Sequence, residues 1–326
     1  MKEILRQVKE TEKENNHPID AVIAWVDGND EDHQNKMKKY LPNNGFINKK
    51  EFITQYNQLD EIKYTVHSIL KFAPFIRKIF IVTDNQIPKF LKDNSKIYEK
   101  VVIVDHTEIF KGDSKYLPVF NSISIATKLY KIPDLSENFI YFNDDVLLLK
   151  PVDPSDFFIQ GKPVIRARWS RFKENVFYKN IVKKKKIMPS YVIAQEKGAK
   201  LLGFKKLLRF HHTPHPLRIS TTSDFFRSNR SLETNNIKYR FKNSSQFLMI
   251  GLANHLETKN KSSFLKKDYQ LIHFRNYNKP MFWLKFKLNF LSKKQKKLFL
   301  NLQSLDQCPK PKQDYIIDWL TKKYAI

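Results

Sequence analysis

Two adjacent carboxylates and an amide interrupt an apolar stretch near the middle of the chain, FIYFNDDVLLL (139–149). Neighbouring Asp side chains in such a stretch are costly to bury unless they are paired or bind a metal. Carboxylate oxygens are ligands that Mg²⁺ and Mn²⁺ prefer, and such an ion can bridge phosphate oxygens. We therefore expect Asp144 and Asp145 to bind Mg²⁺ or Mn²⁺, with Asn143 beside them. The alternative is a capped turn that leaves a strand, because Asp is common in turns.

A second candidate region is HHTPHP (211–216), which supplies three imidazoles: His211, His212 and His215. Imidazole binds zinc readily, but Pro214 blocks a regular helical face and no cysteine lies nearby. We therefore favour a histidine that contacts phosphate or moves a proton. Further along, KYRFK (238–242) supplies Arg240, a residue type that binds phosphate and neutralises charge during phosphoryl transfer. By itself, an arginine in so basic a protein is more often simply solvated.

The composition excludes several other kinds of protein. The chain has 326 residues, of which 41% are hydrophobic, so it can bury a large core. A single cysteine excludes a disulfide framework, and seven glycines without GxGxxG or GxxxxGKS/T argue against a Gly-rich phosphate loop. The net charge of +26 indicates an anionic partner, either nucleic acid, anionic lipid, or a phosphorylated substrate or product.

The elements that must position these side chains follow from apolar spacing. Runs rich in apolar and β-branched residues predict strands at 19–26, 78–83, 101–104 and 139–149. Helical spacing predicts helices at 58–72 (with Asn57 as N-cap), 121–131, 190–202 and 243–258. Strands that alternate with helices indicate an α/β fold with a mostly parallel sheet, followed by a helical C-terminal half.

Polar residues follow each predicted strand: Asp27, Asp84, Asp105 and the Asn143-Asp144-Asp145 group. Ligands bind at the carboxyl ends of strands in such sheets, so this convergence predicts an active site there. For Asp105 taken alone, we favour an ordinary turn residue.

Several blocks of the chain resemble the Stealth family of sugar-1-phosphate transferases. They are IDAVIAWVDGND (19–30), the segment from about 55 to 158, and HHTPHP (211–216) onward to the region of Phe247. The family includes bacterial capsular polysaccharide phosphotransferases and the catalytic subunit of the animal lysosomal-enzyme N-acetylglucosamine-1-phosphotransferase. The Asn-Asp-Asp segment also looks like the Asp-x-Asp strand end of GT-A nucleotide-sugar transferases, so we expect a GT-A/Rossmann-like core.

The resemblance implies that a sugar-1-phosphate passes from a nucleotide-sugar, UDP-linked, to a hydroxyl of a glycan or lipid-linked polysaccharide acceptor. The product would be a phosphodiester in capsular or other cell-surface polysaccharide. By matching positions, we expect three catalytic residues: Asp145, His212 and Arg240. We expect further residues to contact the substrates: Asp27, Asp30, Arg77, Asp84, Asn143 and His215.

Three positions depart from the family pattern. His67 stands where an Arg is usual, and Ala126 stands where a Glu is frequent. The fourth block of the family is matched to LIHFRN (271–276), which lacks the expected carboxylate. These departures bear on how the donor and the metal would be held.

We expect one continuous unit: an N-terminal helical extension (1–18), a catalytic domain (19–258) and a basic helical C-terminal part (259–326). The charged N-terminus lacks an apolar signal segment and no apolar run is long enough to span a bilayer, which predicts a cytoplasmic protein. Residues 259–298 contain 12 Lys or Arg and one acid, and their interleaved aromatics suggest peripheral attachment to anionic inner-membrane lipid. An ordinary surface helix with a core face would explain them equally well.

Two other functions remain open on the sequence. An ordinary metal-dependent GT-A-type glycosyltransferase would attack the anomeric carbon and release a nucleoside diphosphate. A basic nucleic-acid-binding protein would also explain the charge and the aromatics, but the chain contains no recognisable nucleic-acid-binding module.

Overall fold

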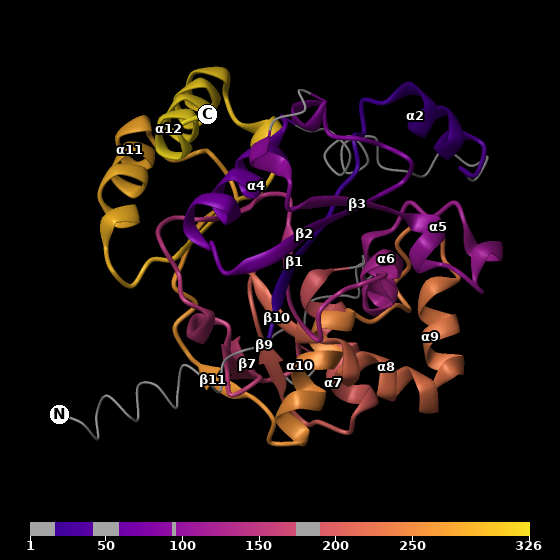
Figure 1. The fold of residues 1–326 in the computed structure, drawn as a ribbon. Coiled ribbons are helices and arrows are strands. Elements are labelled where there is room, and N and C mark those ends of the chain that lie inside the picture. Colours follow the sequence, from indigo (N-terminus) through magenta and orange to yellow (C-terminus); the bar gives the residue numbers. More distant parts are fainter. Residues whose placement is uncertain (1–16, 42–58, 93–95, 174–189) are drawn as a thin grey trace, which may run out of the picture.

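A five-stranded sheet forms the centre of the computed structural model, which describes residues 17–41, 59–92, 96–173 and 190–326 (Figure 1). Its strand order is β10-β4-β1-β2-β3. The strands are β1 (Ile19–Ala24), β2 (Ile76–Thr83), β3 (Val101–Asp105), β4 (Asn138–Asn143) and β10 (His215–Arg218). β1 to β4 pair in parallel and β10 runs antiparallel to β4, which confirms the predicted mostly parallel α/β sheet.

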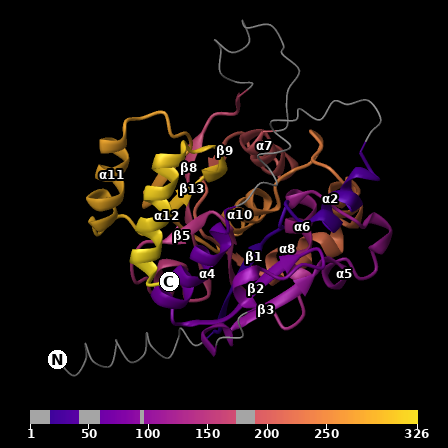
Figure 2. The same cartoon turned by 90° about the horizontal axis from the view of Figure 1, so that it is seen from above.

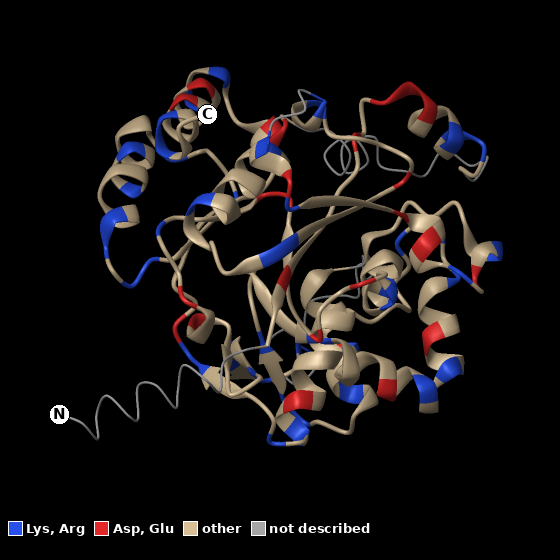
Figure 3. Cartoon of the chain, viewed as in Figure 1, with Lys and Arg blue, Asp and Glu red and all other residues tan. Residues whose placement is uncertain are grey.

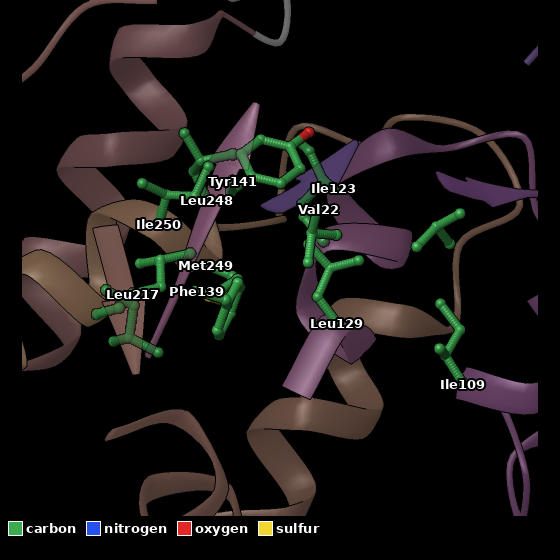
Figure 4. Packing of buried hydrophobic residues seen from close by; sticks show 14 of the residues in the cluster. Val22, Ile109, Ile123, Leu129, Phe139, Tyr141, Leu217, Leu248, Met249 and Ile250 are labelled. Atoms are coloured by element: carbon green, nitrogen blue, oxygen red, sulfur yellow. The ribbon is translucent and has the colours of Figure 1, made fainter. Parts of the chain in front are cut away.

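Both faces of this sheet are buried, because side chains that alternate along each strand enter two different cores. On β1, Val22 packs into one core, whereas Ala21 and Ile23 pack into the other. Figure 4 shows the first core, to which α6 (Ser122–Lys128) and α10 (Met249–Lys259) contribute. The second core lies under α4 (Glu61–Phe72), on the opposite side of the sheet (Figure 2).

The remaining helices surround this centre. They are α2 (Glu31–Lys38), α5 (His106–Ile109), α7 (Tyr191–Leu201), α8 (Ile219–Ser228), α9 (Arg230–Ile237), α11 (Met281–Asn289) and α12 (Lys310–Tyr324). The second half of the chain is therefore largely helical, as predicted. It also contributes short strands to small sheets: β7 (Lys162–Arg166) with β6 (Phe158–Ile159) and β11 (Phe264–Lys266), and β8 (Arg168–Ser170) with β9 (Leu207–Arg209). None of the helices in the described ranges is both long and apolar enough to cross a bilayer.

The single strand predicted at 139–149 is two strands in two sheets. β4 ends at Asn143, and after a turn at Asp144 and Asp145 the chain enters β5 (Val146–Leu148). β5 pairs with β13 (Phe299–Leu302), which pairs in turn with β12 (Leu271–Phe274). The apolar pattern continues across the turn because both strands are buried, so hydrophobicity alone does not reveal the change of sheet.

Two predicted helices begin later in the structure. α4 begins at Glu61 with Asp60 as its N-cap, whereas Asn57 lies outside the described residues. α10 begins at Met249 instead of at 243, because Asn243 and Gln246 close a turn: the Asn243 amide donates to Gln246 Oε1 at 2.9 Å. Such local side-chain bonds compete with helix formation. Positions 1–16 of the predicted helical extension lie outside the described residues.

Candidate active site

A cavity of about 360 Å³ lies beyond the carboxyl ends of β1 and β4. Ala24 and Trp25 from the end of β1 and the three polar residues at the end of β4 form one side. Several later segments complete it, with Tyr191, His212, His215, Lys242 and Gln303. The cavity is therefore at the edge of the sheet where the sequence predicted a site, because parallel strands end there together.

Asn143 and His212 meet in this cavity. The Asn143 amide nitrogen lies 3.2 Å from His212 Nδ1, and the imidazole stacks on the ring of Tyr191 at 4.3 Å between centroids. Burial, together with the nearby charges of His273 and His211, lowers the pKa of His212 to about 4. The imidazole is therefore neutral at physiological pH and available to accept a proton.

Asp144 and Asp145 form the turn between the two sheets, and backbone contacts hold that turn. Thr65 Oγ1 donates to the Asp144 carbonyl at 2.6 Å, and Asn301 Nδ2 donates to the Asp145 carbonyl at 3.3 Å. Burial raises the pKa of Asp145 to about 6, although a hydrogen bond from Asn301 opposes this. Burial and the charge of Asp145 both raise the pKa of Asp144.

This carboxylate pair fits a hard divalent cation. Asp145 Oδ1 is buried without a hydrogen-bond partner among the described residues, and a cation would satisfy it. The described part of the chain contains no cluster of three or more His, Cys, Asp or Glu side chains suited to a metal. Two carboxylates would suffice for Mg²⁺, since its sites commonly combine one or two carboxylates with water and substrate phosphates.

His215 and His211 flank His212 but occupy different surroundings. His215 lies on β10 opposite Tyr141, its ring contacts Phe210 edge-on at 4.8 Å, and burial lowers its pKa to about 3. His211 packs edge-on against Tyr269 at 4.5 Å. Among these three histidines, His212 and His215 line the cavity.

Three carboxylates from the first two strand ends lie next to the cavity instead of lining it. Asp30 is the N-cap of α2, accepting a hydrogen bond from the His33 amide at 2.7 Å. The Asp27 backbone is held by Gln86, whose side chain both accepts from its amide and donates to its carbonyl. Burial alone would raise the pKa of Asp84, but hydrogen bonds from His33 and Lys36 lower it to about 2. His33, which contacts Asp84 at 3.5 Å, does line the cavity.

Asp105 caps a helix. It accepts from Thr107 N at 2.9 Å, while Glu108 accepts from the Asp105 amide in a reciprocal capping box that starts α5. Asp105 thus has a local structural role as a helix cap, which agrees with the preference for a structural residue at this position.

Arg77 does not lie in the cavity. It stands at the amino end of β2, the edge of the sheet opposite the cavity, where it pairs with Asp20 through Nε at 3.0 Å and Nη2 at 2.7 Å. Asp20 is fully buried and also accepts from the backbone amides of Lys78 and Ser136. Arg77 thus holds the buried Asp20 at this edge, away from the cavity in which a substrate contact was expected.

Arg240 lies on a loop beside the cavity, with its guanidinium 4.6 Å from the Tyr40 ring centroid and one nitrogen donating to the Leu117 carbonyl at 3.3 Å. Lys242, two residues later, lines the cavity. The loop is anchored by buried amides: Asn121 Nδ2 donates to Gln246 Oε1 at 2.8 Å. The structure therefore brings Lys242 to the cavity wall and places Arg240 behind it.

Several residues of the site have no signal in the sequence. Tyr191 lies in a segment predicted to be a helix, and Lys242 lies in a basic segment expected to be solvated. Both reach the cavity only because of how these segments pack in the fold. Asp145 is contacted from β13, by the side chain of Asn301 and the backbone amide of Leu302. LIHFRN (271–276) was the segment expected to provide the fourth block. An isolated amide within the apolar strand FLNL (299–302) is the one local sign of this contact.

Comparison with known proteins identifies two regions of the chain. Family models described as Stealth protein CR1, conserved region 1, and Stealth protein CR2, conserved region 2, match residues 17–45 and 55–165. The receptor polysaccharide phosphotransferase WefC of Streptococcus oralis is 33% identical over 258 residues, which cover 70% of this chain and 74% of WefC.

Other relatives match a shorter segment. The capsular polysaccharide phosphotransferases cps1A of Actinobacillus pleuropneumoniae and fcs1 of Haemophilus influenzae are 44% and 48% identical over 144 and 143 residues. These alignments cover 43% of this chain but 38% of each relative, so the chain matches little more than a third of their length. Among solved structures, the galactosyltransferase LgtC aligns over 93% of this chain and 95% of its own, with a TM-score of 0.44 and 11% identity.

Proposed function

The chain belongs to the Stealth family, and from that premise we propose that it transfers a sugar-1-phosphate from a UDP-linked sugar to a hydroxyl of a glycan acceptor. The product is a phosphodiester linkage in a capsular or other cell-surface polysaccharide. The observation that carries this proposal is the contact between Asn143 and His212, which joins the strand-end carboxylates to a neutral imidazole within one cavity. The names of the relatives, which are polysaccharide phosphotransferases, support it.

In the proposed reaction, the acceptor hydroxyl attacks the β-phosphorus of the donor in line with the bond to the bridging oxygen. The new oxygen–phosphorus bond forms as the bond to the bridging oxygen breaks, and UMP leaves with that oxygen. His212 accepts the proton of the acceptor hydroxyl at Nε2, while its Nδ1–H donates to the side-chain oxygen of Asn143, whose amide is turned so that oxygen and nitrogen exchange places. The amide of Asn143 and the ring of Tyr191 hold the imidazole in place, so that proton transfer needs little reorganisation.

Asp144 and Asp145 would hold Mg²⁺ or Mn²⁺. Such an ion supplies Lewis-acid stabilisation of the charge that develops on the phosphoryl oxygens. Lys242 on the cavity wall would supply positive charge to the transferred phosphoryl group. Arg240, on the same loop but outside the cavity lining, would clamp that group only after its guanidinium left the Tyr40 ring. Asp27, Asp30 and Asp84, at the neighbouring strand ends, would orient the nucleotide or the sugar.

The released nucleotide tests the proposal directly. Purified protein is incubated with a panel of UDP-sugars and capsule oligosaccharides in the presence of Mg²⁺ or Mn²⁺, and the nucleotides are separated by anion-exchange chromatography. We expect UMP in equal amount to the phosphodiester formed. Release of UDP with a new glycosidic bond would instead establish an ordinary glycosyltransferase.

We also propose that the enzyme works in the cytoplasm at the inner face of the membrane, attached peripherally through α11. The inner face of this helix is buried through Leu284 and Leu288. Its outer face exposes the rings of Phe282 and Phe286, and Phe290, which directly follows the helix, is exposed as well. Figure 3 shows basic bands and no acidic ones on α11, as an anionic lipid surface would require.

A further inference from the structure

A second cavity, of about 220 Å³, opens between β12 and α11. No Asp or Glu of the described ranges lines it. Its polar and aromatic lining includes His273, Arg275, Asn276, Lys279, Trp283 and Lys287. A cavity with this lining favours an anionic ligand, since several cations surround it without a compensating carboxylate.

The two cavities are neighbours. His273, on the wall of the second cavity, lies 3.2 Å from Gln303 through Nε2 and Oε1, and Gln303 lines the first cavity. The His273 ring is also 6.1 Å from the ring of His212. A ligand long enough to leave the candidate active site past Gln303 would therefore meet the second cavity next.

The second cavity combines cations with a flat aromatic surface. Trp283 is 39% exposed and stacks on Phe286, with centroids 5.4 Å apart, so its indole presents a fixed plane. Lys287 is held in place by the His273 carbonyl at 3.4 Å and by the ring of Phe274. Arg275 and Lys279 are exposed at the rim. Aromatic planes suit the apolar face of a sugar ring, and Arg and Lys suit phosphate oxygens.

We propose that the second cavity is a subsite for the phosphodiester-linked sugar chain that the candidate active site extends, with a backbone phosphate between Arg275 and Lys279 and a sugar ring on Trp283. This inference rests on the proposed function, because such a chain is its product and its next acceptor. A chain with one negative charge per repeat would be retained by this subsite between successive transfers.

Direct binding tests the subsite without turnover. The probe is a tetramer of N-acetylglucosamine units joined by 1-phosphodiesters, titrated calorimetrically into the full-length protein beside a neutral N-acetylglucosamine tetramer. Arg275→Ala with Lys279→Ala is compared with the control Lys285→Ala with Lys310→Ala, which removes equal charge from positions outside the cavity. We expect the Kd of the charged tetramer to rise about tenfold or more in the first double variant and less than twofold in the control. We expect the neutral tetramer to bind all three proteins equally.

A kinetic arm separates the subsite from the reaction. In Trp283→Ala, we expect KM for the charged tetramer as acceptor to rise several-fold while kcat and the KM of a single-repeat acceptor stay unchanged. Trp169→Ala removes a partly exposed indole outside both cavities and serves as the control. Equal losses in both double variants would overturn the subsite, because long-range charge would then explain binding. The subsite would also be overturned if Arg275→Ala with Lys279→Ala lost binding to phosphatidylglycerol vesicles but kept tetramer binding. These residues would then form a lipid-binding surface. If the wild type releases no UMP but binding of the charged tetramer still depends on Arg275 and Lys279, the proposed function fails and the subsite stands.

Discussion

The ring of Tyr191 lies nearly parallel to the imidazole of His212, with 4.3 Å between the centroids and 20° between the planes. Asn143 contacts the same imidazole at its edge, so His212 is restrained both across its face and in its plane. Tyr191 begins α7, whereas His212 precedes β10. The orientation of the candidate base thus depends on how a helix and a strand from the second half of the chain pack together.

Loss of the Tyr191 ring is expected to slow transfer. Aromatic pairs contribute roughly 0.5–1.5 kcal/mol, so Tyr191→Leu should lower kcat up to about tenfold with little change in the KM of the donor. Tyr191→Phe keeps the ring and should retain nearly full kcat. Steady-state kinetics on both variants provide the measurement, and equal rates in the two would remove the stacked ring from the mechanism.

Replacement of the carboxylate or the imidazole is expected to abolish transfer. Asp145→Ala and His212→Ala should each release no measurable UMP, because one removes a metal ligand and the other removes the proton acceptor. Chelation with EDTA should abolish transfer by the wild type, as Asp145→Ala does. Added Mg²⁺ should then restore transfer by the wild type but not by Asp145→Ala. Circular dichroism should show that both variants remain folded; near-normal turnover in either would exclude that residue.

Removal of Arg77 is expected to affect stability and not chemistry. Arg77→Ala leaves the buried Asp20 carboxylate without its ion pair, at a cost of about 1–3 kcal/mol in the free energy of unfolding. The control Arg227→Ala breaks a pair with Asp224 in which both side chains are mostly exposed, and should cost less than about 0.5 kcal/mol. Urea unfolding compares the two. A rise in the KM of the donor without destabilisation would return Arg77 to the site.

His106 is expected to make the fold sensitive to acid. Burial lowers its pKa to about 4 in the folded protein, although the charges of Asp84 and Asp105 oppose this. The unfolded chain binds this proton from about pH 6.5 downward. Between these values the unfolded state therefore holds more protons, so the contribution of His106 to stability is present above pH 6.5 and is lost toward pH 4.

The variant His106→Phe isolates this effect. Both ring nitrogens of His106 are buried and have no hydrogen-bond partner among the described residues, so a phenyl ring should be tolerated. Relative to the variant, the wild type should lose up to about 1.4 kcal/mol of unfolding free energy per pH unit below pH 6.5. Above pH 7 the difference between them should be constant. Denaturant unfolding at several pH values measures both slopes, and parallel slopes from pH 6.5 to pH 4.5 would contradict the assignment.

The exposed aromatics of α11 are expected to attach the protein to anionic membranes. The triple variant Phe282→Ser, Phe286→Ser and Phe290→Ser should lose most sedimentation with phosphatidylglycerol vesicles, because these rings would insert at the headgroup boundary. This variant keeps the buried Leu284 and Leu288, whereas deletion of 281–300 would also remove part of the core. Undiminished sedimentation would leave α11 as an ordinary surface helix.

The sequence by itself determined the sheet and one edge of the site. Alternating apolar residues such as Val22 and Ile23 make β1 a strand buried on both faces, and polar residues mark where the strands end. These are local properties, because periodicity and turn chemistry depend on neighbouring residues. The position of Asp145 at a strand end could therefore be predicted, as could the family resemblance.

Only the tertiary structure decided which side chains complete that edge. The fold brings His212 to Asn143 across 69 positions and Asn301 to Asp145 across 156. It pairs Arg77 with Asp20 at the far edge of the sheet, although Arg77 lies in β2 and Asp84 directly follows that strand. The physical reason is that such contacts depend on how separate elements pack and on which buried charge needs a partner. Neither is visible in the pattern of a single segment.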